Sequence, residues 1–171
     1  MSPSEQQSWQ RADSACLALA GALQRRQWML ASAESCTGGL IAGACTALAG
    51  SSVWFERGFV TYSNAAKTES LGVDAALIDT HGAVSEAVAR AMAFGAIRHS
   101  RAQVSVAVTG IAGPAGGSRS KPVGTVWFGF SVAGELSSET LRFDGDRAEV
   151  RAATAAHALQ TLLAKIEARP A

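Results

Sequence analysis

The sequence is poor in aromatic residues, cysteine and charge, and its cysteines and its charge argue against particular classes of protein. Aromatic residues make up 6% of the 171 residues, and Tyr62 is the only tyrosine. The three cysteines include no CxxC pair, which argues against a disulfide framework and against a zinc site, so we expect no metal. The net charge is +1 with no basic block, so we expect no nucleic-acid partner.

Long apolar runs are also missing. No segment approaches the roughly 18 consecutive apolar residues that span a membrane, so we expect no membrane contact. The first residues are polar and lack the apolar core of a signal peptide, which predicts a cytoplasmic protein. The hydrophobic fraction of 48% is typical of a globular chain, and the length predicts one domain over residues 1–171.

Hydrophobic periodicity predicts helices that alternate with strands over the first two thirds of the chain, followed by a strand hairpin. Helices are expected at residues 4–26, 37–48, 64–72, 73–80 and 85–99 and after Asp146, and strands at 28–32, 55–62, 104–108, 123–132 and 136–143. The low charge of 104–108 predicts a central strand. Together these elements predict an α/β fold, a three-layer α/β/α sandwich with a mixed, mostly parallel sheet.

Three polar or glycine-rich loops follow predicted strands, at residues 34–39, 62–67 and 110–117. In open α/β sheets, ligands bind beyond the carboxyl ends of the strands, so we expect these loops to converge on one site. The glycine-rich loop could wrap an anion with its backbone N–H groups, or could simply connect strands. It matches neither a Walker loop nor a GxGxxG fingerprint.

Ser35 lies between a predicted strand and a predicted helix, where helix-terminal N–H groups stabilise negative charge. It is either a nucleophile or, with Thr37, a helix cap. Lys67 is either a solvated helix lysine or a desolvated base that deprotonates Ser35. Tyr62 could donate to an oxyanion or relay a proton, or could leave its hydroxyl in water. Cys36 is a rival nucleophile or a small buried residue.

Other patterns point to no chemistry. Ser118 and Lys121 match S-x-x-K but lie in the glycine-rich loop rather than at a helix start. Ser35 lacks the flanking glycines of a G-x-S-x-G elbow. The three histidines are far apart and have no acidic partner at a telling spacing, which argues against a Ser–His triad and a metal site.

Five blocks of sequence, in order, resemble one known family. They are A-E-S-C-T-G-G at 33–39, W-F-E-R-G-F-V-T-Y-S-N at 54–64 with Lys67, H-G-A-V-S at 81–85, G-I-A-G-P at 110–114 and K-P-V-G-T-V-W at 121–127. Over residues 6–163 the chain resembles the CinA C-terminal domain family, whose enzymatic members are nicotinamide-nucleotide amidohydrolases. It resembles the stand-alone form, because longer relatives carry an additional N-terminal domain.

The resemblance implies hydrolysis of the carboxamide of nicotinamide mononucleotide (NMN) to nicotinic acid mononucleotide and ammonia, without metal or cofactor. It implies that Ser35 is the nucleophile, Lys67 the general base and Tyr62 an assisting group. The expected substrate-binding residues are Glu34, Thr37, Gly38, Gly39, Asn64, Thr109, Gly110, Gly113 and Arg147. Ala115 stands where relatives often have a polar or acidic residue, which leaves the contribution of that loop to substrate contact open.

Three questions stay open at the level of sequence. The cation for the substrate phosphate is Arg57, Arg119, Lys121 or Arg147. Trp54 and Trp127 are either exposed, which would favour a homo-oligomer, or buried; we expect a homo-oligomer. The alternative function is a non-catalytic interaction or regulatory domain linked to competence or recombination proteins.

Overall fold

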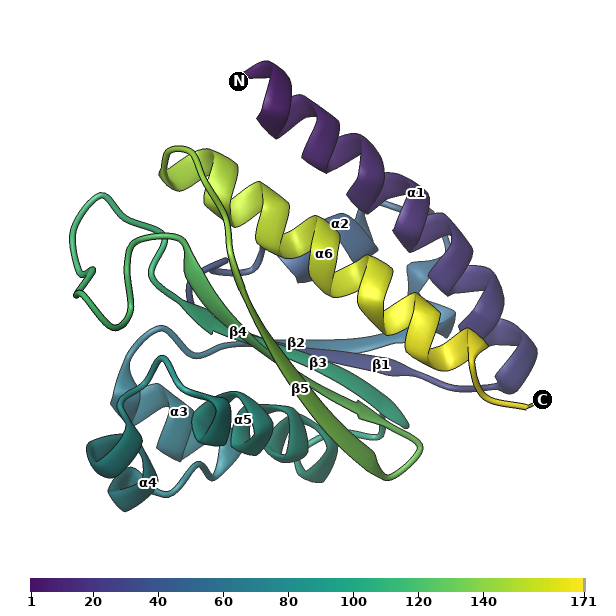
Figure 1. Ribbon diagram of the computed structural model, residues 1–171. Helices are drawn as coiled ribbons and strands as arrows, with labels where there is room; N and C mark the ends of the chain where they lie inside the picture. Colours follow the sequence, from purple (N-terminus) through teal and green to yellow (C-terminus); the bar gives the residue numbers. More distant parts are fainter. Residues whose placement is uncertain (171) are drawn as a thin grey trace.

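The computed structural model describes residues 1–170 and consists of one sheet between helices (Figure 1). The helices are α1 (Pro3–Arg26), α2 (Leu40–Thr46), α3 (Asn64–Leu71), α4 (Ala75–His81), α5 (Glu86–Arg98) and α6 (Arg147–Glu167), with a 3-10 turn, η1 (Ser51–Val53). The strands are β1 (Leu30–Glu34), β2 (Phe55–Val60), β3 (Val104–Gly110), β4 (Thr125–Val132) and β5 (Glu135–Arg142).

The sheet has the order β2-β1-β3-β4-β5. Strand β1 pairs in parallel with β2 and β3, whereas β4 pairs antiparallel with β3 and β5. Four strands therefore run in one direction and β4 runs against them, which confirms the predicted mixed, mostly parallel sheet. Strand β1 is wholly buried and β3 almost so, as expected for central strands of a two-sided sheet.

Helices cover both faces of the sheet, which confirms the predicted three layers. Helices α1, α2 and α6 lie on one face and α3, α4 and α5 on the other (Figure 1). Each face has its own cluster of buried apolar side chains. Leu30 and Val106 belong to the cluster beneath α1 and α6, and Ala31 and Ala107 to the cluster beneath α5. The alternation follows from the two-residue period of a strand.

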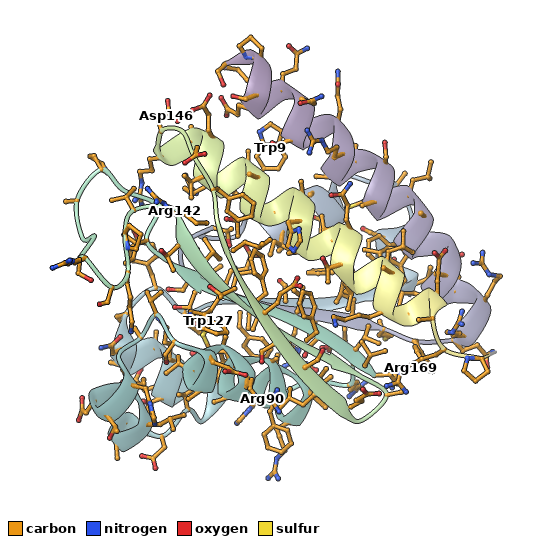
Figure 2. All side chains as sticks on the ribbon, viewed as in Figure 1. Trp9, Arg90, Trp127, Arg142, Asp146 and Arg169 are labelled. Carbon is orange, nitrogen blue, oxygen red and sulfur yellow. The ribbon has the colours of Figure 1, made fainter. Side chains whose placement is uncertain are left out.

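The two helices that matter most for the site, α3 and α6, begin where the sequence predicts, at residue 64 and after Asp146. Ser63 caps α3 by accepting a hydrogen bond from the Ala66 N–H, and Gly72 ends that helix at φ +67°. Asp146, labelled in Figure 2, caps α6 and forms a capping box with Glu149. Because these caps set where α3 and α6 begin, they determine the positions of Lys67 and Arg147 on the two helices.

Two predicted elements are displaced, and both displacements concern the candidate nucleophile. The strand predicted at 28–32 is observed at Leu30–Glu34, and the helix predicted at 37–48 is observed only at Leu40–Thr46. Gly38 and Gly39 have φ values of +61° and +101°, which an α-helix does not contain, so residues 36–39 form a turn. Ser35 therefore lies between a strand end and a tight turn rather than at a helix start.

The structure removes the observation behind the predicted homo-oligomer. Trp54 is buried in the core, and Trp127, labelled in Figure 2 on the α5 side of the sheet, is partly buried. Neither offers an exposed apolar patch, and the homo-oligomer stays a prediction. No helix within residues 1–170 is long and apolar enough to cross a membrane.

Candidate active site

Ser35 is fixed where the carboxyl ends of three neighbouring strands meet. It directly follows β1, and its N–H donates to the Val108 carbonyl of β3 at 3.0 Å. On the other side, the Thr61 N–H just beyond β2 donates to the Glu34 carbonyl at 2.8 Å. Ser35 is 9% exposed, so its hydroxyl reaches solvent only through the adjoining pocket.

Lys67 contacts the Ser35 hydroxyl directly. Its Nζ donates to Ser35 Oγ at 3.1 Å and to the Thr61 carbonyl at 2.9 Å. Helical side chains tilt toward the helix N-terminus, so Lys67, in the first turn of α3, points back at the strand ends. Only 1% of the residue is exposed, and no salt bridge between described residues involves it.

Burial lowers the pKa of the Lys67 ammonium below its usual range. A neutral amine in this place can donate one N–H to the Thr61 carbonyl and present its lone pair to the Ser35 hydroxyl. Nucleophile and base are thus within hydrogen-bond reach, which is the geometric requirement for an activated serine.

Glu34 organises the turn that follows Ser35. It is fully buried, and its carboxylate accepts five hydrogen bonds. The donors are Ser32 Oγ at 3.2 Å, Thr37 Oγ1 at 2.7 Å and the N–H groups of Gly39 at 3.0 Å, Ile41 at 3.0 Å and Ala42 at 2.8 Å. The carboxylate therefore satisfies the free N–H groups that begin α2 and holds the turn against the end of β1.

A cavity of about 220 Å³ opens at the Ser35–Lys67 pair. Its lining residues come from five segments around the strand ends: Ser35, Cys36, Tyr62, Asn64, Lys67, Ala83, Val84, Thr109, Gly110, Ala112 and Arg147. Arg147, the first residue of α6, donates to Tyr62 Oη and to the Gly113 carbonyl, each at 2.9 Å. The cavity thus contains the Ser35–Lys67 pair and the cationic side chain of Arg147.

Seven of the twelve residues expected at the site line this cavity: Ser35, Tyr62, Asn64, Lys67, Thr109, Gly110 and Arg147. The other five, Glu34, Thr37, Gly38, Gly39 and Gly113, do not line it. Glu34 is fully occupied in holding the turn that contains Thr37, Gly38 and Gly39, and Gly113 contributes a carbonyl that positions Arg147. These five residues support the site through these contacts, and their contact with substrate stays a prediction.

The four candidate cations differ in where the structure places them. Arg57 is paired with Glu56 at 2.6 Å and donates to the His99 carbonyl. Lys121 donates to the His81 carbonyl at 3.1 Å, and Arg119 lies in the exposed glycine-rich loop. Only Arg147, of these four, lines the cavity.

Cys36 lies beside Ser35 and lines the same cavity, but the hydrogen bond of Lys67 goes to Ser35 Oγ. Burial raises the pKa of its thiol to about 12, so the reactive thiolate is scarce at neutral pH. Among residues 1–170, no three His, Cys, Asp or Glu side chains gather to hold a metal ion.

Sequence reasoning missed three apolar lining residues, Ala83, Val84 and Ala112, and one cation, Arg151. Ala83 and Val84 lie in the H-G-A-V-S block, so the resemblance contained a signal for them that the residue types alone did not. Arg151 carried no signal, because its role comes from contacts across 114 and 115 residues of sequence.

Fold and site together define an α/β/α domain in which a buried lysine lies against a serine at the ends of parallel strands. The chain belongs to the CinA C-terminal domain family, whose model matches residues 13–166. It is 54% identical over 146 residues to the nicotinamide-nucleotide amidohydrolase PncC of Enterobacter agglomerans, covering 85% of this chain and 89% of that one.

A further relative and a solved structure are similar to this chain over most of its length. PncC of Escherichia coli K12 is 54% identical over 142 residues, covering 82% of this chain and 86% of that one. Among solved structures, the competence/damage inducible protein CihA of Agrobacterium tumefaciens matches with a TM-score of 0.87 and 46% identity, over 90% of this chain and 94% of that one.

Proposed function

We propose that this protein hydrolyses the carboxamide of NMN to nicotinic acid mononucleotide and ammonia, in the recycling of pyridine nucleotides in the cytoplasm. The observation that carries the proposal is the 3.1 Å contact between Lys67 Nζ and Ser35 Oγ in a buried site. Two relatives that cover most of this chain bear the name nicotinamide-nucleotide amidohydrolase. A buried serine–lysine pair supplies the nucleophile and the base that amide hydrolysis needs.

In the first half-reaction, Ser35 Oγ attacks the carboxamide carbon while neutral Lys67 Nζ takes the hydroxyl proton. The tetrahedral intermediate then collapses, the C–N bond breaks, and Lys67 returns the proton so that nitrogen leaves as ammonia. In the second half-reaction, water attacks the Ser35 ester and gives its proton to Lys67. The ester C–O bond breaks, Ser35 Oγ recovers a proton, and the carboxylic acid product leaves. One amine thus acts as base and acid in turn.

The oxyanion needs a hydrogen-bond donor that the fold has not already used. The Gly38 N–H donates to the Ser35 carbonyl and the Gly39 N–H donates to Glu34, so neither is free. No hydrogen bond between described residues uses the N–H of Cys36 or of Thr37, and of these two residues only Cys36 lines the cavity. We assign the oxyanion contact to the Cys36 N–H, directly after the nucleophile. Tyr62 Oη accepts a hydrogen bond from Arg147 and keeps its own proton to donate.

Arg147 is the cation we assign to the substrate phosphate. Replacement by alanine is expected to raise KM for NMN about 10- to 100-fold with a smaller change in kcat, because the phosphate contact exists equally in the ground and transition states. Steady-state kinetics with NMN and with the phosphate-free nucleoside test this assignment. The nucleoside should be turned over by both proteins with similar KM; equal loss on both substrates would contradict a phosphate contact.

The pH dependence should report Lys67. Protonated Lys67 cannot accept the Ser35 proton, so log(kcat/KM) should rise with unit slope as pH rises toward the pKa of Lys67 and level off above it. Because burial lowers that pKa, the plateau should begin well below the usual lysine range. Cys36→Ala is the check on the neighbouring thiol: the charge of Cys36 acts to raise the pKa of Lys67, so its removal should keep the acid limb, in place or moved to lower pH. Loss of the limb in Cys36→Ala would contradict the assignment to Lys67.

The proposed function is tested by incubating purified protein with NMN and measuring both ammonia and nicotinic acid mononucleotide. We expect equal amounts of the two products, no inhibition by chelator, and no release by Ser35→Ala. Folded wild-type protein that releases neither product would reject the proposal. Recovery of a stoichiometric protein partner in that case would favour the interaction domain.

A further inference from the structure

Arg151 reaches from α6 to the turn that follows the nucleophile. Its Nη2 donates to the Thr37 carbonyl at 2.8 Å, and its Nε donates to the Cys36 carbonyl at 3.2 Å. No salt bridge between the residues described includes Arg151. The side chain is partly buried, and its positive charge is directed at two peptide groups rather than at a carboxylate.

The contact to Thr37 begins a chain of peptide groups that ends at the catalytic pocket. The Thr37 carbonyl belongs to the same peptide as the Gly38 N–H, and that N–H donates to the Ser35 carbonyl at 3.2 Å. The Ser35 carbonyl belongs in turn to the same peptide as the Cys36 N–H. A trans peptide holds its C=O and N–H in opposite directions. A hydrogen bond that fixes the carbonyl of one peptide therefore also fixes the direction of its N–H, and that N–H fixes the next carbonyl.

The charge of Arg151 also polarises the peptide groups along this chain of hydrogen bonds. A guanidinium beside a carbonyl oxygen draws electron density toward that oxygen and makes the N–H of the same peptide a stronger donor. The second peptide responds in the same sense, because it accepts from the first. Both effects favour a developing negative charge next to the Cys36 N–H.

We propose that Arg151 is a positioning residue, which orients and polarises the Cys36 N–H through the Thr37–Gly38 and Ser35–Cys36 peptides. Arg151 does not line the cavity at Ser35, so in this role it acts through the backbone rather than by contact at the reacting group. The inference rests on the proposed amide hydrolysis, and deepens it by naming what prepares the oxyanion donor.

Kinetics of Arg151→Met, which keeps an unbranched chain and loses the charge, separate this role from substrate binding. We expect kcat for NMN to fall about 10- to 100-fold, less than the loss for removing an oxyanion donor outright, with KM within about threefold. Arg151→Ala should behave alike and recover part of its kcat in added guanidinium. The matched control is Arg26→Ala. It also loses a guanidinium–carbonyl hydrogen bond, to the Arg169 carbonyl beyond the C-terminal end of α6, and should keep wild-type kcat.

A second readout does not depend on the substrate. Labelling of Ser35 by a fluorophosphonate forms a P–O bond and releases fluoride, and its rate should fall about tenfold in Arg151→Met and not in Arg26→Ala. Wild-type protein that labels on Ser35 but releases no ammonia from NMN would reject the proposed substrate and leave this test of Arg151 intact.

Two results would overturn the inference. One is a wild-type labelling rate and kcat in Arg151→Met. The other is a raised KM with unchanged kcat, which would make Arg151 a substrate contact. Should Arg151→Met fail to fold, Arg151→Lys replaces it, because lysine keeps the charge but not the two-bond geometry. There we expect a fall of about three- to tenfold, and an unchanged rate would also overturn the inference.

Discussion

Replacing Lys67 with methionine is expected to lower kcat for NMN by about 10³-fold or more while the protein stays folded. Methionine fills the space of the buried lysine stem but cannot take the Ser35 proton. Without a base at 3.1 Å, the serine hydroxyl stays protonated and is a weak nucleophile. The melting temperature should be equal or higher, because the cost of burying an amine without a carboxylate partner disappears. Ammonia release and thermal unfolding measure the two effects.

Lys165→Met is the matched control for this substitution. Lys165 lies in the last turn of α6 with its Nζ 5.2 Å from the Phe130 ring centroid, outside the catalytic cavity. The same chemical change there should leave kcat unaltered. If Lys67→Met keeps activity within about tenfold of wild type, Lys67 is not the general base.

Replacing Glu34 with glutamine is expected to cost about 2–4 kcal/mol of unfolding free energy. Oε1 accepts from Ser32 Oγ and the Ala42 N–H, and Oε2 accepts from Thr37 Oγ1 and the N–H groups of Gly39 and Ile41. Either orientation of the amide therefore sets an NH₂ group against at least one fixed backbone N–H. Because the site is fully buried, water cannot replace the lost acceptor.

Urea and thermal unfolding test this prediction, with a decrease in melting temperature of about 5–15 °C expected for a chain of this length. Glu69→Gln is the control, since Glu69 is exposed on α3 and should change stability by less than about 0.5 kcal/mol. The two variants melting at the same temperature would contradict the role given to Glu34. Loss of kcat in Glu34→Gln at temperatures where it remains folded would show that the turn also holds Ser35.

The layers of the fold and several of its boundaries could be predicted from local patterns. Ser63, Gly72 and Asp146 are chemically suited to helix ends, and the structure has them there. Residues 37–39 belong to the predicted helix at 37–48, whereas in the structure they are part of the turn and α2 begins at Leu40. Two glycines in left-handed conformation decide the matter, and nothing in the local sequence states which conformation a glycine adopts.

Residue types alone could predict only part of the candidate site. Ser35 and Lys67 are 32 positions apart, and a helix cap and a solvated lysine are the more common roles for such residues. Their burial and their 3.1 Å contact are what favour a serine–lysine pair over those roles. The resemblance implied that Glu34 binds substrate, and no residue pattern indicated that its side chain is fully buried with five donors around it. The contacts of Arg151 with the carbonyls of Cys36 and Thr37 exist because α6 packs beside the turn at residues 36–39, and this packing is a property of the fold.

The most direct test of the account is rapid acid quenching of wild-type protein during turnover of NMN, followed by mass spectrometry of the peptide that contains Ser35. The account predicts a peptide that carries the nicotinic acid mononucleotide acyl group as an ester on Ser35, and no such species in Ser35→Ala. Ammonia release by Ser35→Ala at the wild-type rate, with no acylated peptide from either protein, would contradict a serine nucleophile.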